Sequence, residues 1–197
     1  MEYFQDTDGS RSKLENPNID TGMGLERLSA ILQGVDNVYE TDLFSDLIKT
    51  ASGLAKISYG QNTKSDRNIR TVVEHTRAAV FLINDGVMPG NENQSYVLRR
   101  IIRRAIRAAR NLGIEHEFIE ELSNQVYINM EPAYPKLIEA REHITTTLVK
   151  EEQQFNKTLR MSTALMDKIV KDAKQNGDSQ LPGEQIFRLY DTYGFPI

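Results

Sequence analysis

Apolar residues recur at three-and-four spacing through most of the chain, which predicts a mainly helical protein. The clearest example runs from residue 91 to residue 112, NENQSYVLRRIIRRAIRAARNL, where the apolar positions form one stripe: Leu98, Ile101, Ile102, Ala105, Ala109 and Leu112. Comparable patterns predict further helices over residues 25–34, 41–58, 67–84, 115–126 and 136–175, with a short one after Pro182.

The first twenty residues follow a different pattern. β-favouring residues alternate around Asp8-Gly9, a pair typical of a hairpin turn, and an extended piece runs from Pro17 to Asp20. Because a lone hairpin is barely stable in water, we expect it to belong to a sheet that continues toward the N-terminus. The predicted fold is therefore a helical bundle preceded by a β-hairpin.

Turn-forming and capping residues mark the expected helix ends. Gly34 and Gly177 are suited to C-terminal ends, and Thr41 is suited to an N-terminal cap. A loop rich in glycine and proline precedes the arginine-containing helix, for which Asn91 or Asn93 would be natural caps.

The composition is that of a folded globular protein, with 39% hydrophobic and 26% charged residues among 197. The sequence has no apolar run of membrane-spanning length and no signal peptide, so we expect a cytoplasmic protein with no membrane partner. There is no cysteine, and His75, His116 and His143 are far apart, which predicts neither a disulfide nor a metal site.

Charge changes the picture at the 91–112 helix. No acidic residue lies between its six arginines, which are Arg99, Arg100, Arg103, Arg104, Arg107 and Arg110. Like charges four residues apart destabilise a helix by about 0.2–0.5 kcal/mol per pair, so a partner must offset them. A polyphosphate backbone is one such partner. With a net charge of −4, internal acids are another, and the acidic segment 115–125 is a candidate neighbour for part of the arginine face. Charge alone leaves both open.

A second candidate site lies at the mouth of the 25–34 helix. The residues Asp20-Thr21-Gly22-Met23-Gly24 precede it, and Arg27 falls in its first turn. Glycines there let the backbone approach a ligand closely, and a guanidinium is suited to phosphate. Taken alone, the pattern also fits an ordinary turn with a surface arginine.

Four segments, read together and in order, resemble the alanyl-tRNA synthetases: DTGMGLERL at 20–28, YETDLF at 39–44, FLINDGVMPGNENQSYVLRRIIRRAIR at 81–107, and RLYDTYGFP at 188–196. The resemblance covers essentially the whole chain and is to an internal piece of a larger enzyme. It implies that residues 1–36 end a class II catalytic domain, built on an antiparallel sheet and carrying motif 3, and that residues 37–197 form a helical tRNA-recognition domain.

The resemblance implies an aminoacyl-tRNA ligase that activates alanine with ATP and Mg²⁺ and transfers it to tRNA(Ala). Arg27 matches the motif 3 arginine that binds the ATP phosphates during catalysis, with Gly24 beside it. Asp20 matches the residue that holds the amino group of alanine, and Gly22 matches a glycine that lines the small amino-acid pocket.

The resemblance also implies recognition of a G·U wobble pair in the tRNA acceptor stem, with no DNA partner. Asn93 and Asp191 match the family residues at that pair, where the accessible minor groove of A-form RNA presents the guanine amino group. The arginines would position the stem through its phosphates: Arg99, Arg100, Arg103 and Arg104.

The sequence departs from the family pattern in two respects. Gln94-Ser95 stands where the family usually has Arg-Gly, so a phosphate contact from that position is not expected. Motifs 1 and 2, the zinc-containing editing domain and the oligomerisation region are absent, and we expect this portion alone to be inactive, with neither ATP nor zinc bound. The alternative is a non-catalytic helical module that docks an acidic protein through its arginine face. The feature that discriminates between the two hypotheses is Asn93 together with Asp191, because docking of an acidic protein does not require an amide and a carboxylate beside the arginine face.

Overall fold

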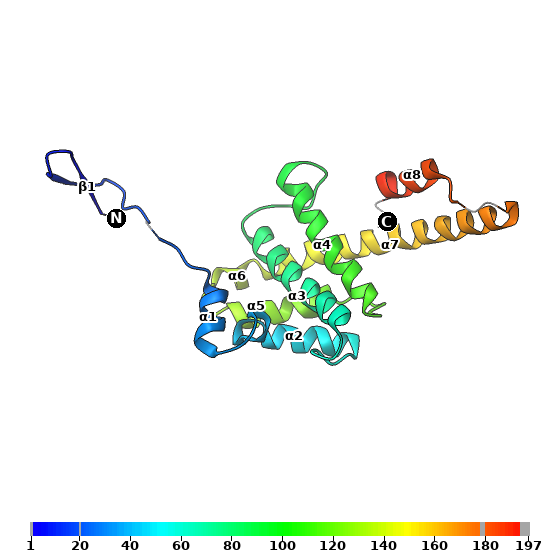
Figure 1. Ribbon diagram of the computed structural model, residues 1–197, viewed down its shortest axis with the longest axis horizontal. Coiled ribbons are helices and arrows are strands. Elements are labelled where there is room, and N and C mark those ends of the chain that lie inside the picture. Colours follow the sequence, from blue (N-terminus) through cyan, green and yellow to red (C-terminus); the bar gives the residue numbers. More distant parts are fainter. Residues whose placement is uncertain (1, 20, 178–179, 194–197) are drawn as a thin grey trace. The chain divides into compact units, whose positions relative to one another are not determined.

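The computed structural model describes residues 2–19, 21–177 and 180–193, without the side chains of residues 190–193. Contacts along the chain divide it into two compact units, residues 1–45 and 46–197. The elements are coloured in chain order in Figure 1. The two units are described in turn.

The first unit begins with the predicted hairpin. Strand β1 (Tyr3–Gln5) pairs antiparallel with β2 (Arg11–Lys13), with Phe4 opposite Ser12. The Asp8 carboxylate fixes the turn by accepting hydrogen bonds from the backbone N–H of Ser10 at 2.8 Å and from its hydroxyl at 2.6 Å. These bonds lower the pKa of Asp8 below its ordinary value, because they favour the charged carboxylate.

Helix α1 (Leu25–Gln33) follows and ends at Gly34, as predicted. Gly34 has a φ of 65°, a left-handed conformation that glycine adopts without steric cost. A short 3₁₀ helix, η1 (Val38–Glu40), then leads to α2 (Asp42–Ala55), which begins directly after Thr41.

The second unit is the predicted helical bundle. Its further helices are α3 (Thr63–Asn84), α4 (Asn93–Asn111), α5 (Ile119–Met130), α6 (Lys136–Glu139), α7 (Arg141–Asn176) and α8 (Gly183–Tyr193). Helix α3 packs mainly on α4, and α5 and α7 also pack on α3. The residues that recur at helical spacing along α3 are buried: Ile69, Val72, Val73, Thr76, Val80 and Ile83.

Several helix boundaries differ from the sequence prediction. Helix α5 begins and ends about four residues later than the predicted 115–126 helix, and α2 ends at Ala55 rather than at residue 58. Helix α3 begins four residues early because Asn62 caps it, accepting from the backbone N–H groups of Lys64 and Ser65. The predicted 136–175 helix is divided at Ala140 into α6 and α7. At α4 the prediction that Asn91 or Asn93 caps the helix is wrong: Glu92 occupies the cap position without a side-chain cap bond.

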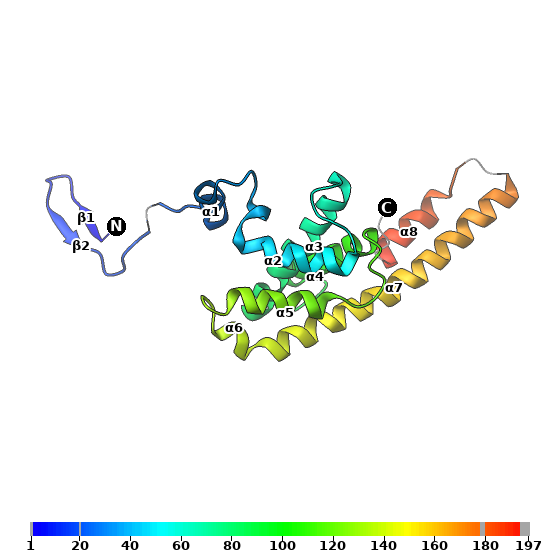
Figure 2. The ribbon, with the colours of Figure 1, turned by 90° about the horizontal axis from the view of Figure 1, so that it is seen from below.

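The long helix α7 extends past the bundle, and α8 folds back along its C-terminal half (Figures 1 and 2). Within the bundle the apolar stripe of α7 is buried, for example at Leu148 and Phe155. Leu165 continues the apolar spacing of this helix but is 36% exposed. The reason is that few elements surround this part of α7.

The described residues include no helix long and apolar enough to cross a membrane.

We predict that truncating the apolar stripe of α4 destabilises the bundle. Ile102 is fully buried, so Ile102→Ala should lower the free energy of unfolding by about 2–5 kcal/mol. Val97 on the same helix is 52% exposed, so Val97→Ala should change it by no more than about 0.5 kcal/mol. Urea unfolding of the two variants followed by circular dichroism tests this, and equal losses would contradict the burial pattern.

Candidate nucleic-acid interface

The arginines of α4 divide into two groups. The first faces α7, where Arg99 Nε and Arg103 Nε lie 3.2 Å and 2.9 Å from the same oxygen, Oε1 of Glu151. The Arg103 guanidinium also lies over the Phe155 ring, 5.0 Å from its centroid. Farther along the helix, Arg110 donates to the carbonyl of Ile114 and to Asn156 Oδ1. These three arginines therefore brace α4 against its neighbours.

The second group consists of Arg100, Arg104 and Arg107, and all three are exposed. Their spacing of four and three residues places them along one helix face. Within the described residues no ion pair holds them. Burial is the main cause that lowers the pKa of His75 on α3, and the positive charge of Arg104 lowers it further. Glu74 raises this pKa by a smaller amount. This face therefore presents unneutralised positive charge to solvent.

The turn before α4 carries the candidate base-reading residue. Asn93 is exposed and has a φ of 49°, a left-handed conformation that asparagine tolerates better than most residues. The backbone N–H of Gly90 donates to the Ser95 carbonyl at 3.0 Å, which folds the turn onto the first turn of the helix. A Cβ on Gly90 would lie 2.7 Å from the Ser95 Cβ, so only glycine fits there.

Arg99 ties this turn to the helix. Its Nη1 donates to Asn91 Oδ1, and its Nη2 lies 3.4 Å from the Pro89 carbonyl. The Asn91 side chain therefore binds an arginine rather than capping α4. A contact network runs from Glu151 on α7 through Arg99 to the turn that precedes Asn93.

A second buried acid, Glu152, caps a neighbouring helix. It is fully buried, and its carboxylate accepts from the backbone N–H groups of Phe118 and Ile119 at the start of α5, at 3.2 Å and 3.3 Å. Desolvation is the main cause that raises the Glu152 pKa to about 7, and Glu117 raises it further. The two backbone bonds and Arg110 oppose that rise.

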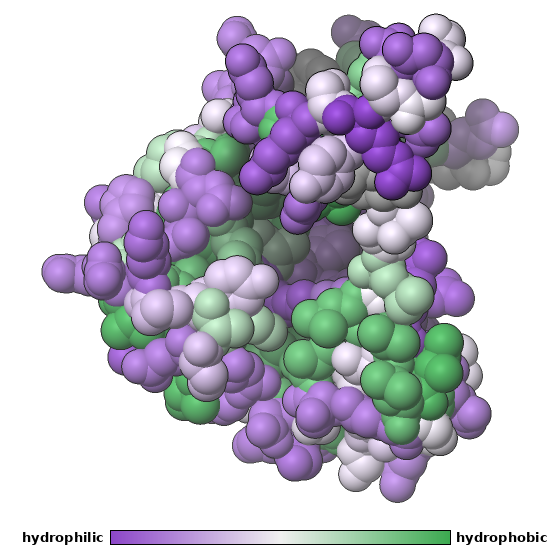
Figure 3. Space-filling model, turned by 90° about the vertical axis from the view of Figure 1, so that its left-hand side faces the viewer, coloured by the Kyte–Doolittle hydropathy of each residue, from purple (hydrophilic) through white to green (hydrophobic). Residues whose placement is uncertain are grey.

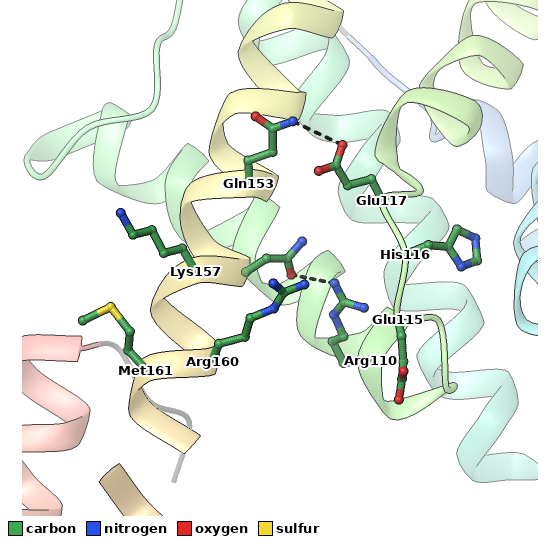
Figure 4. Close-up of a pocket in the computed structure, with 9 residues that line it drawn as sticks. Arg110, Glu115, His116, Glu117, Gln153, Lys157, Arg160 and Met161 are labelled. Carbon is green, nitrogen blue, oxygen red and sulfur yellow. Dashed lines mark hydrogen bonds between the residues drawn. The ribbon is translucent and has the colours of Figure 1, made fainter. Parts of the chain in front are cut away.

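The acidic segment 115–125 begins next to the C-terminal end of α4. A pocket of about 480 Å³ lies there, lined by Arg110, by Glu115, His116 and Glu117, and by residues of α7. In Figure 4, Arg110 and Arg160 extend toward one another across this pocket, and Gln153 donates to Glu117 at 3.2 Å. Cations and acids both line it, so the pocket presents no single charge.

The predicted ATP site lies in the first unit. Arg27 is exposed in the first turn of α1, and a Cβ on Gly24 would lie 3.4 Å from Arg27 Cδ. Nothing lies within 4 Å of the corresponding position at Gly22, so the backbone there is open to a ligand. Asp20 lies outside the described residues. In the described ranges no group of three or more His, Cys, Asp or Glu side chains is placed to hold a metal ion.

Apolar side chains surround this candidate site. Those of Met23 and Leu25 are 76% and 62% exposed, and Ile31 and Leu32 farther along α1 are equally open. Figure 3 shows one face of the protein, and apolar side chains gather in part of that surface. An apolar area of this kind is typical of a surface that another part of a protein covers.

Comparison with known proteins agrees with the four sequence segments. A family model described as tRNA synthetases class II (A) matches residues 1–197. The chain is 42% identical over 196 residues to alanine–tRNA ligase of Clostridioides difficile, covering 100% of this chain and 22% of that protein. The corresponding enzyme of Acidithiobacillus ferridurans is 44% identical over 197 residues, again covering 100% of this chain and 22% of the relative. That of Parafrankia is 51% identical over 180 residues, covering 91% of this chain and 20% of the relative.

The chain belongs to the class II alanyl-tRNA synthetases. It spans about 20–22% of the length of the relatives just described. The resemblance to this family is thus confirmed, as is the mainly helical fold with its N-terminal hairpin.

The proposed wobble-pair residues of this synthetase segment are placed only in part. Asp191 lies within α8, but its side chain is outside the described residues, so its distance from Asn93 stays a prediction. Sequence reasoning missed Glu151 and Glu152. A signal for both was present, because they fall on the apolar stripe between Leu148 and Phe155, where an acid is out of place.

We predict that Glu152 makes stability depend on pH. Its pKa is higher in the folded chain, about 7, than its ordinary value of 4.5, so the folded state holds the proton more tightly. The stability that this proton confers is complete below about pH 4.5 and is lost as pH rises through about 7. At about 1.4 kcal/mol per pKa unit, the loss approaches roughly 3 kcal/mol.

Glu152→Gln is the matched variant, since it replaces the carboxyl with a neutral group of the same size. The free energy of unfolding, measured in urea, should be similar for the variant and the unsubstituted protein at pH 5. At pH 8 it should be higher for the variant. Parallel pH profiles for the two proteins would contradict the assignment.

Proposed function

We propose that this segment serves an alanine–tRNA ligase that activates alanine with ATP and transfers it to tRNA(Ala). It would contribute ATP and alanine contacts from its first unit and acceptor-stem recognition from its second. The support is family membership over the whole chain, together with an exposed cationic face on α4 beside the turn that carries Asn93.

The phosphate contacts fall to the exposed arginines. Arg100 and Arg104, which the family resemblance also assigns to tRNA, are free to meet backbone phosphates, and Arg107 continues the same face. Arg99 and Arg103 approach Glu151 instead, so their first role is to hold α4 and its turn in place. A docking site for an acidic protein is the competing use of this face.

The wobble pair would be read by an amide and a carboxylate. A G·U wobble leaves the guanine 2-amino group without a partner in the shallow groove, where an acceptor can bind it. Asn93 offers both a donor and an acceptor, and Asp191 offers acceptors when ionised. Asn91 lies two residues before Asn93, but its oxygen already accepts from Arg99.

The first unit would serve adenylate formation. The alanine carboxylate would attack the α-phosphate of ATP, forming alanyl-adenylate while the bond to the β-phosphate breaks and pyrophosphate leaves with Mg²⁺. Arg27 offers a planar fork of donors that stays charged, so it can hold and neutralise the phosphates while the substrates are positioned. The open backbone at Gly22 and Gly24 lets a ligand approach α1 closely, and Asp20 would hold the alanine ammonium.

The arginine assignment predicts a change in salt dependence. Arg104→Ala in the intact synthetase should weaken binding to an acceptor-stem minihelix and lower the slope of log K against log salt by about one, equally for G·U and G·C stems. Fluorescence anisotropy at several salt concentrations measures this. Binding that does not respond to salt would favour the protein-docking alternative.

The amide assignment predicts a change in specificity. Asn93→Ala should reduce discrimination between the G·U and G·C minihelices by about 1–3 kcal/mol, the range for one base contact in DNA, with little change in salt slope. Aminoacylation kinetics on both minihelices measure it. Gln94→Ala, which truncates an exposed amide on the next residue, is the matched control and should leave the discrimination unchanged. Unchanged discrimination in Asn93→Ala would remove Asn93 from the wobble pair.

The motif 3 assignment predicts a specific defect in activation. Arg27→Ala should raise the ATP concentration needed for pyrophosphate exchange, because phosphate charge is no longer neutralised. Arg27→Lys should recover part of the loss, since it restores charge without the planar fork. Normal exchange in Arg27→Ala would remove Arg27 from the ATP site.

A further inference from the structure

We propose that Glu151 on α7 is a positioning residue for acceptor-stem recognition, which it supports by holding, through Arg99, the turn that presents Asn93. The inference rests on the proposed function and adds to it a residue far from the turn in sequence. It identifies the carboxylate that sets the geometry of a base-reading turn without touching RNA itself.

The first step is the position of the carboxylate. Glu151 is only 6% exposed, yet its one oxygen Oε1 lies within 3.2 Å of two guanidinium nitrogens, on Arg99 and Arg103. An acid this buried costs free energy unless it is paired and hydrogen-bonded. Arg103 Nε supplies the aligned hydrogen bond, whereas Arg99 Nε forms an ion pair without one. Glu151 therefore fixes the middle of α4 relative to α7.

The second step is the reach of Arg99. While its Nε faces Glu151, its two terminal nitrogens face the turn, at Asn91 Oδ1 and at the Pro89 carbonyl. A guanidinium is planar and rigid, so fixing one edge fixes the direction of the others. Removing the carboxylate therefore frees Arg99 to rotate toward solvent and releases both contacts to the turn.

The third step is that the turn needs an external hold. Asn93 occupies a left-handed conformation that is uncommon outside glycine, and α4 has no side-chain cap of its own. The bond from Gly90 to Ser95 closes the turn, but it does not fix the Asn91 side chain. Arg99 supplies that hold, and Glu151 orients Arg99.

The test uses the intact synthetase and separates recognition of the G·U pair from activation of alanine. Glu151→Gln keeps the size of the side chain and removes the charge. It should lower the G·U over G·C preference in kcat/KM by about 10-fold to 100-fold, the scale expected when a positioning group is displaced by about 1 Å. Pyrophosphate exchange should not change, because the ATP contacts lie on α1.

Matched variants exclude a merely structural role. Glu152→Gln, the adjacent buried acid that caps α5, should leave the preference unchanged. Arg99→Ala should lose the same preference as Glu151→Gln, and the double variant should lose no more than either one, because both act on one network.

If Glu151→Gln lowered kcat/KM equally on the G·U and G·C minihelices, the inference would be overturned, since an equal loss would indicate a general packing defect. An unchanged preference in Glu151→Gln, with a loss in Asn93→Ala or Asn91→Ala, would overturn the inference alone. An unchanged preference in all of these variants would overturn the proposed wobble reading as well.

Discussion

The bundle depends on one constraint: six arginines on a single helix, with no acid among them, have to coexist beside an apolar core. The fold meets this by placing one buried carboxylate, Glu151, between Arg99 and Arg103, which are four residues apart. Like charges at that spacing destabilise a helix, and a shared anion between them removes the repulsion. Because the anion comes from α7, the same contact also sets how α7 lies along α4.

This arrangement leaves an excess of positive charge on α4, which is available to bind an anionic partner. Two cations share one anion, so the pairing is incomplete even where the arginines are most engaged. The exposed trio Arg100, Arg104 and Arg107 adds to this excess, although the whole chain carries −4. A stripe whose charge opposes that of the whole molecule favours binding to a polyanion by local contact rather than by long-range attraction.

The helices could be predicted from the sequence because their apolar spacing has a local cause, and the same holds for the turns at Gly34 and Gly177. The division of the arginines could not be predicted, since it depends on a carboxylate that arrives 48 residues after Arg103. The exposure of Leu165 could not be predicted for a related reason: its periodicity fits a core, but periodicity does not reveal whether a neighbour is present. The motif residues were found by family resemblance, and their contacts with substrate remain predictions.

The two adjacent acids of α7 show why burial alone does not define a role. Glu151 faces guanidinium groups, while Glu152 faces backbone N–H groups and carries a pKa raised to about 7. A carboxyl that gains a proton within the neutral range is a poor anchor for an arginine, because the attraction would disappear with protonation. Glu151 contacts the guanidinium groups of α4, whereas Glu152 is suited to cap a helix, where its carbonyl oxygen accepts in either protonation state.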